Sequence, residues 1–286
     1  MTLIDEKVVT STAAPAPGAP VTGGSRIGAK VRGWLPPLGV FAVIIGIWYV
    51  ISYVVLDEQR RFLMPPPHRV ITDALLDPVA MERMTIALLR SVQVAFTGLG
   101  IAIVIGMAWA IGMSQARWVE RSLFPYAVVL QCIPILALVP LIGFWFDFGF
   151  VSRVIVCVLI SLFPIVSNTL FGLQSVDRGH HDLFTLHHAS RWTRLRKLEL
   201  PAALPAIFAG LRISAGLSVI GAIVGDLFFK QGDPGLGIVI DNYRARLQSP
   251  ELFMAIILAS LLGVVVFWFF GWLGKRVVGA WYVTER

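Results

Sequence analysis

Six long apolar stretches constrain this chain of 286 residues more than any other feature. A membrane core of roughly 30 Å requires about 20 apolar residues in a helix that rises 1.5 Å per residue. The stretches that meet this requirement are Trp34–Leu56, Ile86–Met113, Leu123–Phe146, Phe150–Leu173, Ala203–Phe229 and Leu252–Gly274. Because lipid cannot satisfy the hydrogen bonds of a bare backbone, these stretches are expected to be helices. The sequence therefore predicts an all-α polytopic membrane protein with six spans.

The composition excludes several other classes of protein. Hydrophobic residues make up 57% of the chain and charged residues 14%, against about 45–50% and 25% in soluble domains. A net charge of +7 on this apolar background does not indicate nucleic-acid binding. The two cysteines, Cys132 and Cys157, both lie inside predicted spans, where cysteine usually acts as a small hydrophobic residue.

The distribution of charge predicts how the spans are oriented. If both termini are cytoplasmic, the excess of basic over acidic residues in the inner segments equals the whole net charge of +7. This is the bias expected of cytoplasmic loops, so both termini are predicted to be cytoplasmic. The first apolar run begins only at Trp34, so we expect an uncleaved first span rather than a signal peptide.

The chain divides into a polar tail and a membrane domain. Residues 1–33 are rich in Ala, Pro, Gly, Ser and Thr and are predicted to be a disordered cytoplasmic tail, with the membrane domain at 34–286. In the outer segment 57–85, apolar residues at helical spacing follow Pro65-Pro66-Pro67 and predict a short interfacial helix. Pro134, Pro140 and Pro164 are expected to interrupt spans three and four, as in a packed interior or a pathway.

The inner loop 174–200 lies between spans four and five. Its pattern predicts a short helix over 182–190 and a basic amphipathic continuation over 191–200, which Pro201 and Pro205 end. One interpretation is a membrane-surface helix whose Arg and Lys side chains contact anionic lipid. The order of the residues favours a second interpretation.

This loop resembles the EAA loop of the permeases of ABC importers. The resemblance rests on the run Asp182-Leu-Phe-Thr-Leu-His-His-Ala-Ser-Arg-Trp192, on Leu198-Glu-Leu-Pro-Ala-Ala-Leu-Pro205 and on Ala209-Gly-Leu-Arg212. Ile133-Pro134, Leu138-Val-Pro-Leu141 and Gly235-Leu-Gly237 agree with it. These residues are most similar to those of the nitrate/sulfonate/taurine branch, and the resemblance covers about residues 35–280.

The resemblance implies the type I ABC-importer permease fold and a coupling helix that docks on a cytoplasmic ATPase. The residues it assigns to this coupling loop are Asp182, His188, Ala189, Ser190, Arg191 and Pro201. The loop departs from the family pattern, because Asp182 replaces Glu, Leu183 and Phe184 replace two Ala residues, and His188 replaces Gly. Histidine adopts a positive φ more readily than most residues, so the turn is expected to persist. The bulkier Leu183 and Phe184 suggest an ATPase with a wider groove.

The resemblance also implies the partners. They are a second permease copy, two copies of the ABC ATPase and an extracytoplasmic substrate-binding protein, all at a bacterial plasma membrane. No G-x-x-x-x-G-K-[ST] phosphate loop occurs, so ATP and Mg²⁺ are expected in the partner and this chain is not itself an enzyme. The family branch carries sulfonates, taurine or nitrate, and its relatives carry thiamine-pyrimidine precursors or riboflavin.

Polar residues within the spans are candidates for the substrate pathway. They are Gln131, Asn168, Ser218 and Asp226. Asp226 is the strongest because ionisable groups in a membrane usually face a cavity or a partner, although it lies near a span end. Ser and Asn more often form hydrogen bonds between helices. An ion-coupled secondary transporter is the alternative, but apart from Asp226 and Arg212 the spans offer it almost no charge; a membrane scaffold would not explain the proline-broken helices.

Four histidines in the inner loop raise the possibility of a metal site. They are His180, His181, His187 and His188. The two pairs are seven residues apart, about 10 Å along a helix, whereas shared ligation requires a spacing of three or four. We therefore expect these side chains to face solvent or a partner.

Overall fold

The computed structural model describes residues 26–279, with side chains from residue 36 onward. All regular secondary structure in this part of the chain is helical, with no strand. Five helices are long and apolar enough to cross a membrane, or six if one bent pair counts as a single span. The all-α, six-span prediction is therefore confirmed.

The described residues up to Val50 form a separate N-terminal unit. Its helix α1 (Arg26–Val50) contains the start of the first apolar span, Pro36–Val55. Residues 1–25 of the predicted tail lie outside the described residues, whereas residues 26–33 belong to α1.

The second unit begins with short helical turns, and long helices follow. The turns are η1 (Ile51–Val55), η2 (Glu58–Arg60), α2 (Pro67–Val70) and η3 (Ile71–Leu75), so the short helix predicted after the three prolines is present. The long helices include α3 (Pro78–Ser114), α6 (Phe150–Gln174) and α11 (Ser249–Val278). Helix α10 (Leu236–Ala245), which precedes α11, was not predicted.

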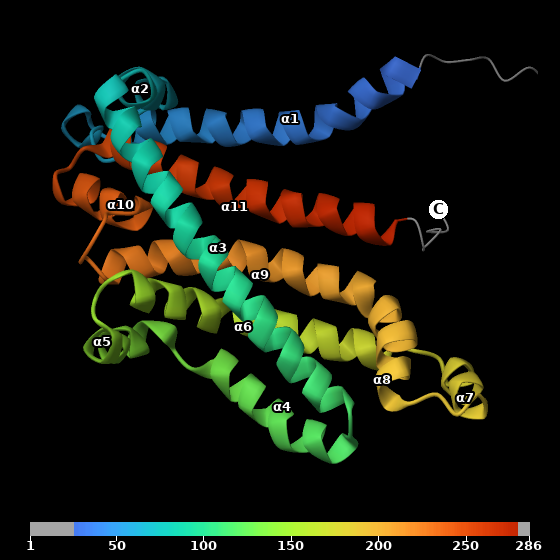
Figure 1. Ribbon diagram of the computed structural model, residues 1–286. Coiled ribbons are helices and arrows are strands. Elements are labelled where there is room, and N and C mark those ends of the chain that lie inside the picture. Colours follow the sequence, from blue (N-terminus) through green and yellow to red (C-terminus); the bar gives the residue numbers. More distant parts are fainter. Residues whose placement is uncertain (1–25, 280–286) are drawn as a thin grey trace, which may run out of the picture. The chain divides into compact units, whose positions relative to one another are not determined.

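Helices α6 and α9 (Leu200–Phe228) form the centre of this unit, with α3 and α11 packed beside them (Figure 1). Glycine allows this close approach. A Cβ atom on Gly210 of α9 would lie 2.7 Å from the Pro164 carbonyl oxygen, and one on Gly221 would lie 2.9 Å from Cα of Cys157. Small residues at helix contacts are typical of membrane bundles, where helices associate by close packing.

The third predicted span, Leu123–Phe146, is not one helix. Helix α4 (Arg117–Cys132) and helix α5 (Ile135–Phe146) meet at an angle of 96°. Between them Ile133 is extended (φ −66°, ψ 126°). Pro134 explains the break, since a proline disfavours helical geometry at the residue before it and lacks an N–H.

The interruptions predicted at Pro140 and Pro164 were wrong, because neither proline ends its helix. Pro140 lies inside α5 and Pro164 inside α6. The predicted stop at Pro201 and Pro205 was wrong, because α8 (Arg191–Arg194), the π-turn η4 (Leu195–Glu199) and α9 form one continuous helical stretch, Arg191–Phe228. Pro201 lies in the first turn of α9, just after the π-turn, where an altered bonding pattern accommodates a residue without an N–H.

Candidate coupling loop and buried charge cluster

The inner loop contains a short helix, α7 (Arg178–Leu186), that starts and ends earlier than the predicted 182–190. Asp177 sets the start, since its side chain accepts a hydrogen bond from the backbone N–H of Gly179 as an N-cap. Asp182 therefore lies in the middle of the helix and is exposed.

The end of α7 is a Schellman turn. The N–H of His188 donates to the Thr185 carbonyl at 2.9 Å, and the N–H of Ala189 donates to the Phe184 carbonyl at 3.0 Å. These are the two bonds that define the motif, and the residue at its left-handed position is normally glycine. His188 occupies that position with φ +49°. The prediction that His188 preserves the turn is confirmed.

A new helical segment starts immediately after this turn. The Ser190 hydroxyl caps α8 by accepting from the N–H of Thr193 at 3.2 Å. Arg194 then reaches back, and its Nη2 donates to the Thr185 hydroxyl at 3.0 Å. Because α8 continues into α9, this bond ties α7 to a helix of the bundle.

The surface of α7 carries exposed apolar side chains. Leu183 is 50% exposed and Leu186 is 77% exposed, and their spacing of three places them on one face. Trp192 on α8 is 68% exposed. Figure 1 shows α7 projecting beyond the ends of α6 and α9. Exposed apolar residues on a helix held in this way are typical of a surface that docks a partner.

The remaining residues assigned to the coupling loop differ in exposure. Ser190 and Arg191 are exposed beside His188, whereas Ala189 is half-buried. Pro201 is also half-buried but belongs to α9, so it is not part of the α7 surface.

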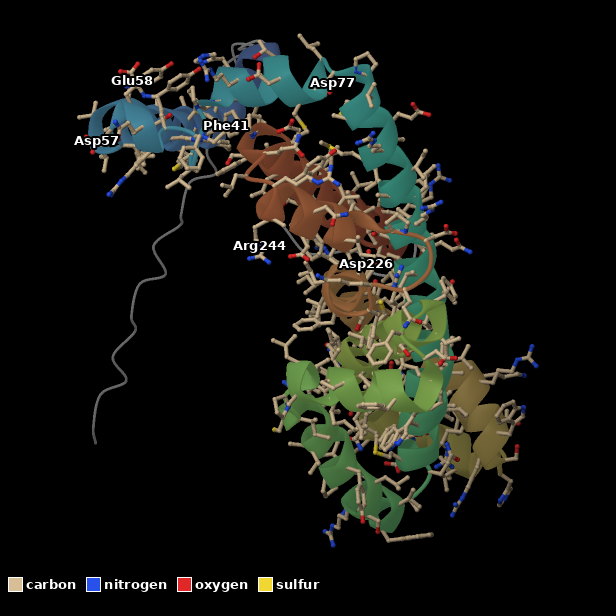
Figure 2. The ribbon with its side chains drawn as sticks, turned by 90° about the vertical axis from the view of Figure 1, so that its left-hand side faces the viewer. Phe41, Asp57, Glu58, Asp77, Asp226 and Arg244 are labelled. Atoms are coloured by element: carbon tan, nitrogen blue, oxygen red, sulfur yellow. The ribbon has the colours of Figure 1, made fainter. Side chains whose placement is uncertain are left out.

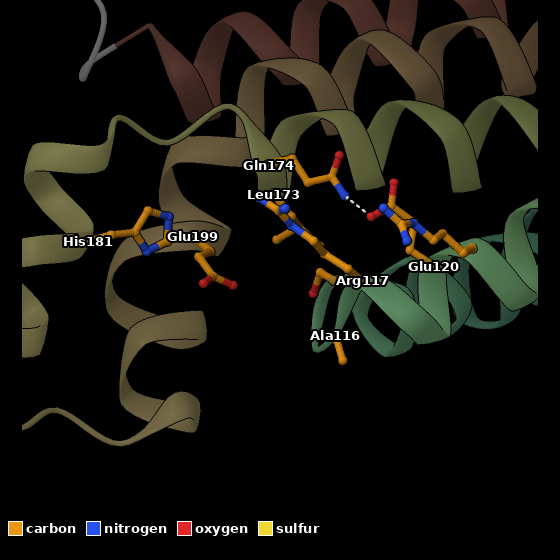
Figure 3. A pocket seen from close by; sticks show the side chains of 9 residues that line it. Ala116, Arg117, Glu120, Leu173, Gln174, His181 and Glu199 are labelled. Carbon is orange, nitrogen blue, oxygen red and sulfur yellow. Dashed lines mark hydrogen bonds between the residues drawn. The ribbon is translucent and has the colours of Figure 1, made fainter.

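A polar hollow of about 540 Å³ lies beside α7. It is lined by residues of α4, the end of α6, α7 and η4, among them Arg117, Glu120, Gln174, His181 and Glu199. Nε2 of Gln174 donates to a carboxylate oxygen of Glu120 at 2.8 Å (Figure 3). On the other side, His181 and Glu199 lie next to each other.

A buried ion pair lies near the opposite ends of α6 and α9. Nη1 of Arg153 on α6 lies 3.1 Å from Oδ1 of Asp226 on α9, and the two side chains are 4% and 0% exposed. Oδ2 of Asp226 accepts from the hydroxyl of Ser91 on α3 at 2.8 Å. Figure 2 shows Asp226 among the packed side chains of the helices. The pair therefore links three helices.

The same cluster holds the turn between α9 and α10. Arg153 donates to the carbonyl oxygens of Phe229 at 2.8 Å, Gln231 at 2.6 Å and Asp233 at 2.8 Å. The Ser91 hydroxyl accepts from the N–H of Leu236 at 2.8 Å. A Cβ atom on Gly235 would collide with the carboxylate of Asp226, so the backbone approaches this closely only at glycine.

The four predicted pathway residues lie in different environments. Gln131 is exposed at the end of α4 and lines a hollow of about 190 Å³. Asn168 is half-buried, and its Nδ2 donates to the Pro164 carbonyl at 2.8 Å. Ser218 is 1% exposed and donates to the Ala215 carbonyl, and Asp226 is fully buried. In this conformation neither Ser218 nor Asp226 can contact a solute, because the protomer encloses both.

Sequence reasoning missed Arg153 and Ser91. Arg153 lies three residues after the start of its span, where an arginine resembles an interfacial anchor. Its partner Asp226 is 73 residues away in the sequence, and no local spacing connects them. The sequence did contain one signal. Arg153 lies within a few residues of the start of span four, and Asp226 lies within a few residues of the end of span five. Among the described residues, the histidines of the loop form no cluster of three or more metal-ligating side chains.

Comparison with known families identifies the family of this chain. Residues 102–279 match the family described as binding-protein-dependent transport system inner membrane component. The chain belongs to this family. It is thus a permease of the ABC-importer class, and its family resemblance is confirmed.

Several curated relatives of this permease match over most of both chains. A formylaminopyrimidine transport permease protein of Halalkalibacterium halodurans is 30% identical over 82% of this chain and 90% of its own. A putative aliphatic sulfonates transport permease protein of Bacillus subtilis is 30% identical over 82% and 84%. A nitrate import permease protein of Leptolyngbya laminosa is 28% identical over 89% and 91%.

A solved structure supports the fold. A crystal structure of an amino acid ABC transporter with histidines matches 73% of this permease and 99% of its own chain, with a TM-score of 0.56 at 18% identity. At this identity the similarity concerns the fold alone.

Proposed function

We propose that this permease forms, as a dimer, the membrane pathway of an ATP-driven importer, and that loop 174–200 docks on the ATPase. The observation that carries the docking is the rigid, exposed face of α7. Leu183 and Leu186 are held outward, while a Schellman turn and the bond from Arg194 to Thr185 fix α7 to α9. A helix fixed in this way transmits motion of a bound partner to the bundle as a rigid-body shift.

The proposed orientation places α7 and both termini in the cytoplasm. The basic residues of the loop support it, since Arg191, Arg194, Arg196 and Lys197 all lie beside α7. The ATPase would bind ATP and Mg²⁺ there, and an extracytoplasmic binding protein would deliver the solute at the opposite ends of α6 and α9.

The proposed solute is small, such as a sulfonate, taurine or nitrate. The named sulfonate and nitrate relatives support this class. A thiamine-pyrimidine precursor is the second candidate, because the formylaminopyrimidine relative covers as much of the chain at equal identity. Riboflavin is a further candidate, from a riboflavin transport system permease protein of Chloroflexus aurantiacus that is 35% identical over 58% of this chain.

An ion-coupled transporter without ATP is not favoured. It requires an ionisable group that gains and loses its ion while facing a cavity. Asp226 is instead fully buried against Arg153, and Arg153 also holds three backbone carbonyls.

Co-purification from native membranes tests the docking. The permease, tagged at its C-terminus, is expected to bring down a stoichiometric ATPase. The double variant Asp182→Ala with Ala189→Arg should lose the ATPase and solute uptake while keeping its membrane level. The matched control, Asp73→Ala with Ala245→Arg, makes the same changes at exposed positions outside the loop and should retain the ATPase. A permease that comes down alone, or a loop variant that retains the ATPase, would contradict the proposal.

The solute is tested separately. Labelled taurine, nitrate, formylaminopyrimidine and riboflavin are offered to the binding protein encoded beside the permease, and the ligand that binds is then tested for uptake. Binding of a sulfonate or nitrate supports the first candidate. Selective binding of the pyrimidine or the flavin would replace it.

A further inference from the structure

Arg212 is an exposed cation in the middle of α9. Its guanidinium carbon lies 3.9 Å from the centre of the Phe267 ring on α11, a cation–π contact. Gly271 leaves the space that the side chain uses, since a Cβ atom there would lie 3.3 Å from Nε of Arg212. Across residues 36–279, where side chains are described, no carboxylate forms an ion pair with Arg212. Within this described part of the chain, its charge is therefore left for an anion from elsewhere.

A second cation faces the same hollow. Arg212 and Lys275 line a space of about 360 Å³ together with Trp268, Gly271 and Trp272. Among the described residues that line it, two carry a positive charge and none is acidic. Lys275 lies in the last turn of α11, whereas Arg212 reaches the same hollow from the middle of α9. Two cations flanked by tryptophan are typical of a site for the phosphate of a lipid headgroup.

An apolar groove continues from this basic hollow along the same two helices. It has a volume of about 760 Å³ and shares Trp268 with the hollow, while Phe267 lines the groove and also contacts Arg212. The groove is lined by aliphatic and aromatic residues of α9, α10 and α11, including Ile213, Gly216, Ile220, Ile256, Gly263 and Val264. A basic hollow joined to an apolar groove matches a molecule with an anionic head and a hydrocarbon tail.

We propose that the surface between α9 and α11 binds one anionic phospholipid, with its phosphate at Arg212 and Lys275 and an acyl chain in the groove. A small soluble oxyanion would fill the basic hollow but leave the apolar groove empty. A second copy of the chain would fill the groove but would have to supply acids for both cations. In the proposed orientation the site faces the cytoplasmic leaflet, where anionic lipids attract basic residues.

Native mass spectrometry of the full-length permease, delipidated and titrated with phosphatidylglycerol or phosphatidylcholine, tests this proposal. Removal of one cation by Arg212→Gln or Lys275→Gln should weaken phosphatidylglycerol binding about fivefold. Arg69→Gln, which removes an exposed cation of α2, should leave binding unchanged. Lys275 lies at an exposed helix end, so its variant reports on the site even if the Arg212 variant fails to fold.

The groove is tested by filling it. A Cβ atom at Gly216 meets nothing within 4 Å, and Gly216 lines the groove, so the side chain of Gly216→Leu should extend into the groove and displace the lipid. Gly100 on α3 is equally open, and Gly100→Leu is the matched control that should not.

Three results would overturn the proposal. Equal binding of phosphatidylcholine would show that charge does not select the lipid. Displacement of phosphatidylglycerol by free taurine or nitrate at Arg212, with no effect of Gly216→Leu, would assign the cations to a soluble oxyanion. A permease dimer whose formation prevents lipid binding and is itself abolished by Gly216→Leu would assign the groove to a second copy.

Discussion

The two ends of helices α6 and α9 differ in how their charges are treated. At one end, Asp226 and Arg153 are buried and joined to each other, to Ser91 and to three backbone carbonyls. At the other end, α7 is exposed and fixed by a single side-chain bond and a Schellman turn. The buried end therefore stabilises the bundle, whereas the exposed end is available for a partner. Substitutions at the first should change stability, and substitutions at the second should change coupling.

The largest effect on stability is expected at Asp226. Asp226→Asn removes the charge that faces Arg153 and leaves a buried cation, which costs about 3–5 kcal/mol. Thermal unfolding of the purified permease measures this. Asp233→Asn is the control, because Asp233 forms an exposed ion pair with Arg90 that contributes at most about 1 kcal/mol. Equal stability of the two variants would contradict the structural role of the buried pair.

A smaller loss is expected at Gly235. Gly235→Ala forces a Cβ atom against the Asp226 carboxylate, and such overpacking costs about 1–3 kcal/mol. Gly149→Ala is the matched control, since a Cβ atom there has no neighbour within 4 Å. If Gly235→Ala unfolds at the same temperature as the control, the turn does not depend on this close approach.

A surface pair outside the spans should contribute least. Hydrogen bonds from Lys230, and then from Arg244, hold the pKa of Asp241 below its ordinary value. A lowered pKa means that the folded state favours the carboxylate, so the stabilisation is present at neutral pH and is lost as the pH falls below about 3.8. After solvent screening it is under about 1 kcal/mol. Asp241→Asn should therefore differ slightly from the parent at pH 6, and the difference should shrink as the pH falls below about 3.8. A difference that grows on acidification would have the wrong sign.

A substitution on the exposed helix α7 should weaken binding of the ATPase and leave the stability of the permease almost unchanged. Leu186→Asp alters a surface side chain, so its unfolding should stay within about 0.5 kcal/mol of the parent. Loss of a docking anchor costs about 2 kcal/mol of binding, or roughly thirtyfold in affinity for the ATPase. Unfolding and ATPase binding measured on the same preparation check both parts. A large loss of stability with unchanged binding would place α7 with the structural core instead.

The spans were predictable because length and hydropathy alone determine them, and five of the six are continuous helices as expected. The third predicted span is not one continuous helix, because Pro134 breaks it between α4 and α5. Pro201 has the same chemistry but follows a π-turn, and the helix continues through it. The effect of a proline thus depends on the hydrogen bonds around it, which the sequence does not display.

The candidate site was predictable where its signal is local. His188 in the glycine position of the turn follows from residues within one helix and its cap. The partner of Asp226 does not, since Arg153, Ser91 and Gly235 come together only when α3, α6 and α9 pack. Asp226 was singled out correctly as unusual, but its environment gives it a partner within the protomer.

The most direct test of the account is a crosslink from α7 to the ATPase in native membranes. Cys132 is exposed, so it is first replaced by Ser, and a single cysteine is then introduced at Leu186 or, as the control, at Leu76, which is 67% exposed outside the loop. We predict that a thiol crosslinker joins Leu186→Cys to the ATPase and gives no such product with Leu76→Cys. No product from Leu186→Cys, or equal products from both positions, would contradict the assignment of α7 as the coupling helix.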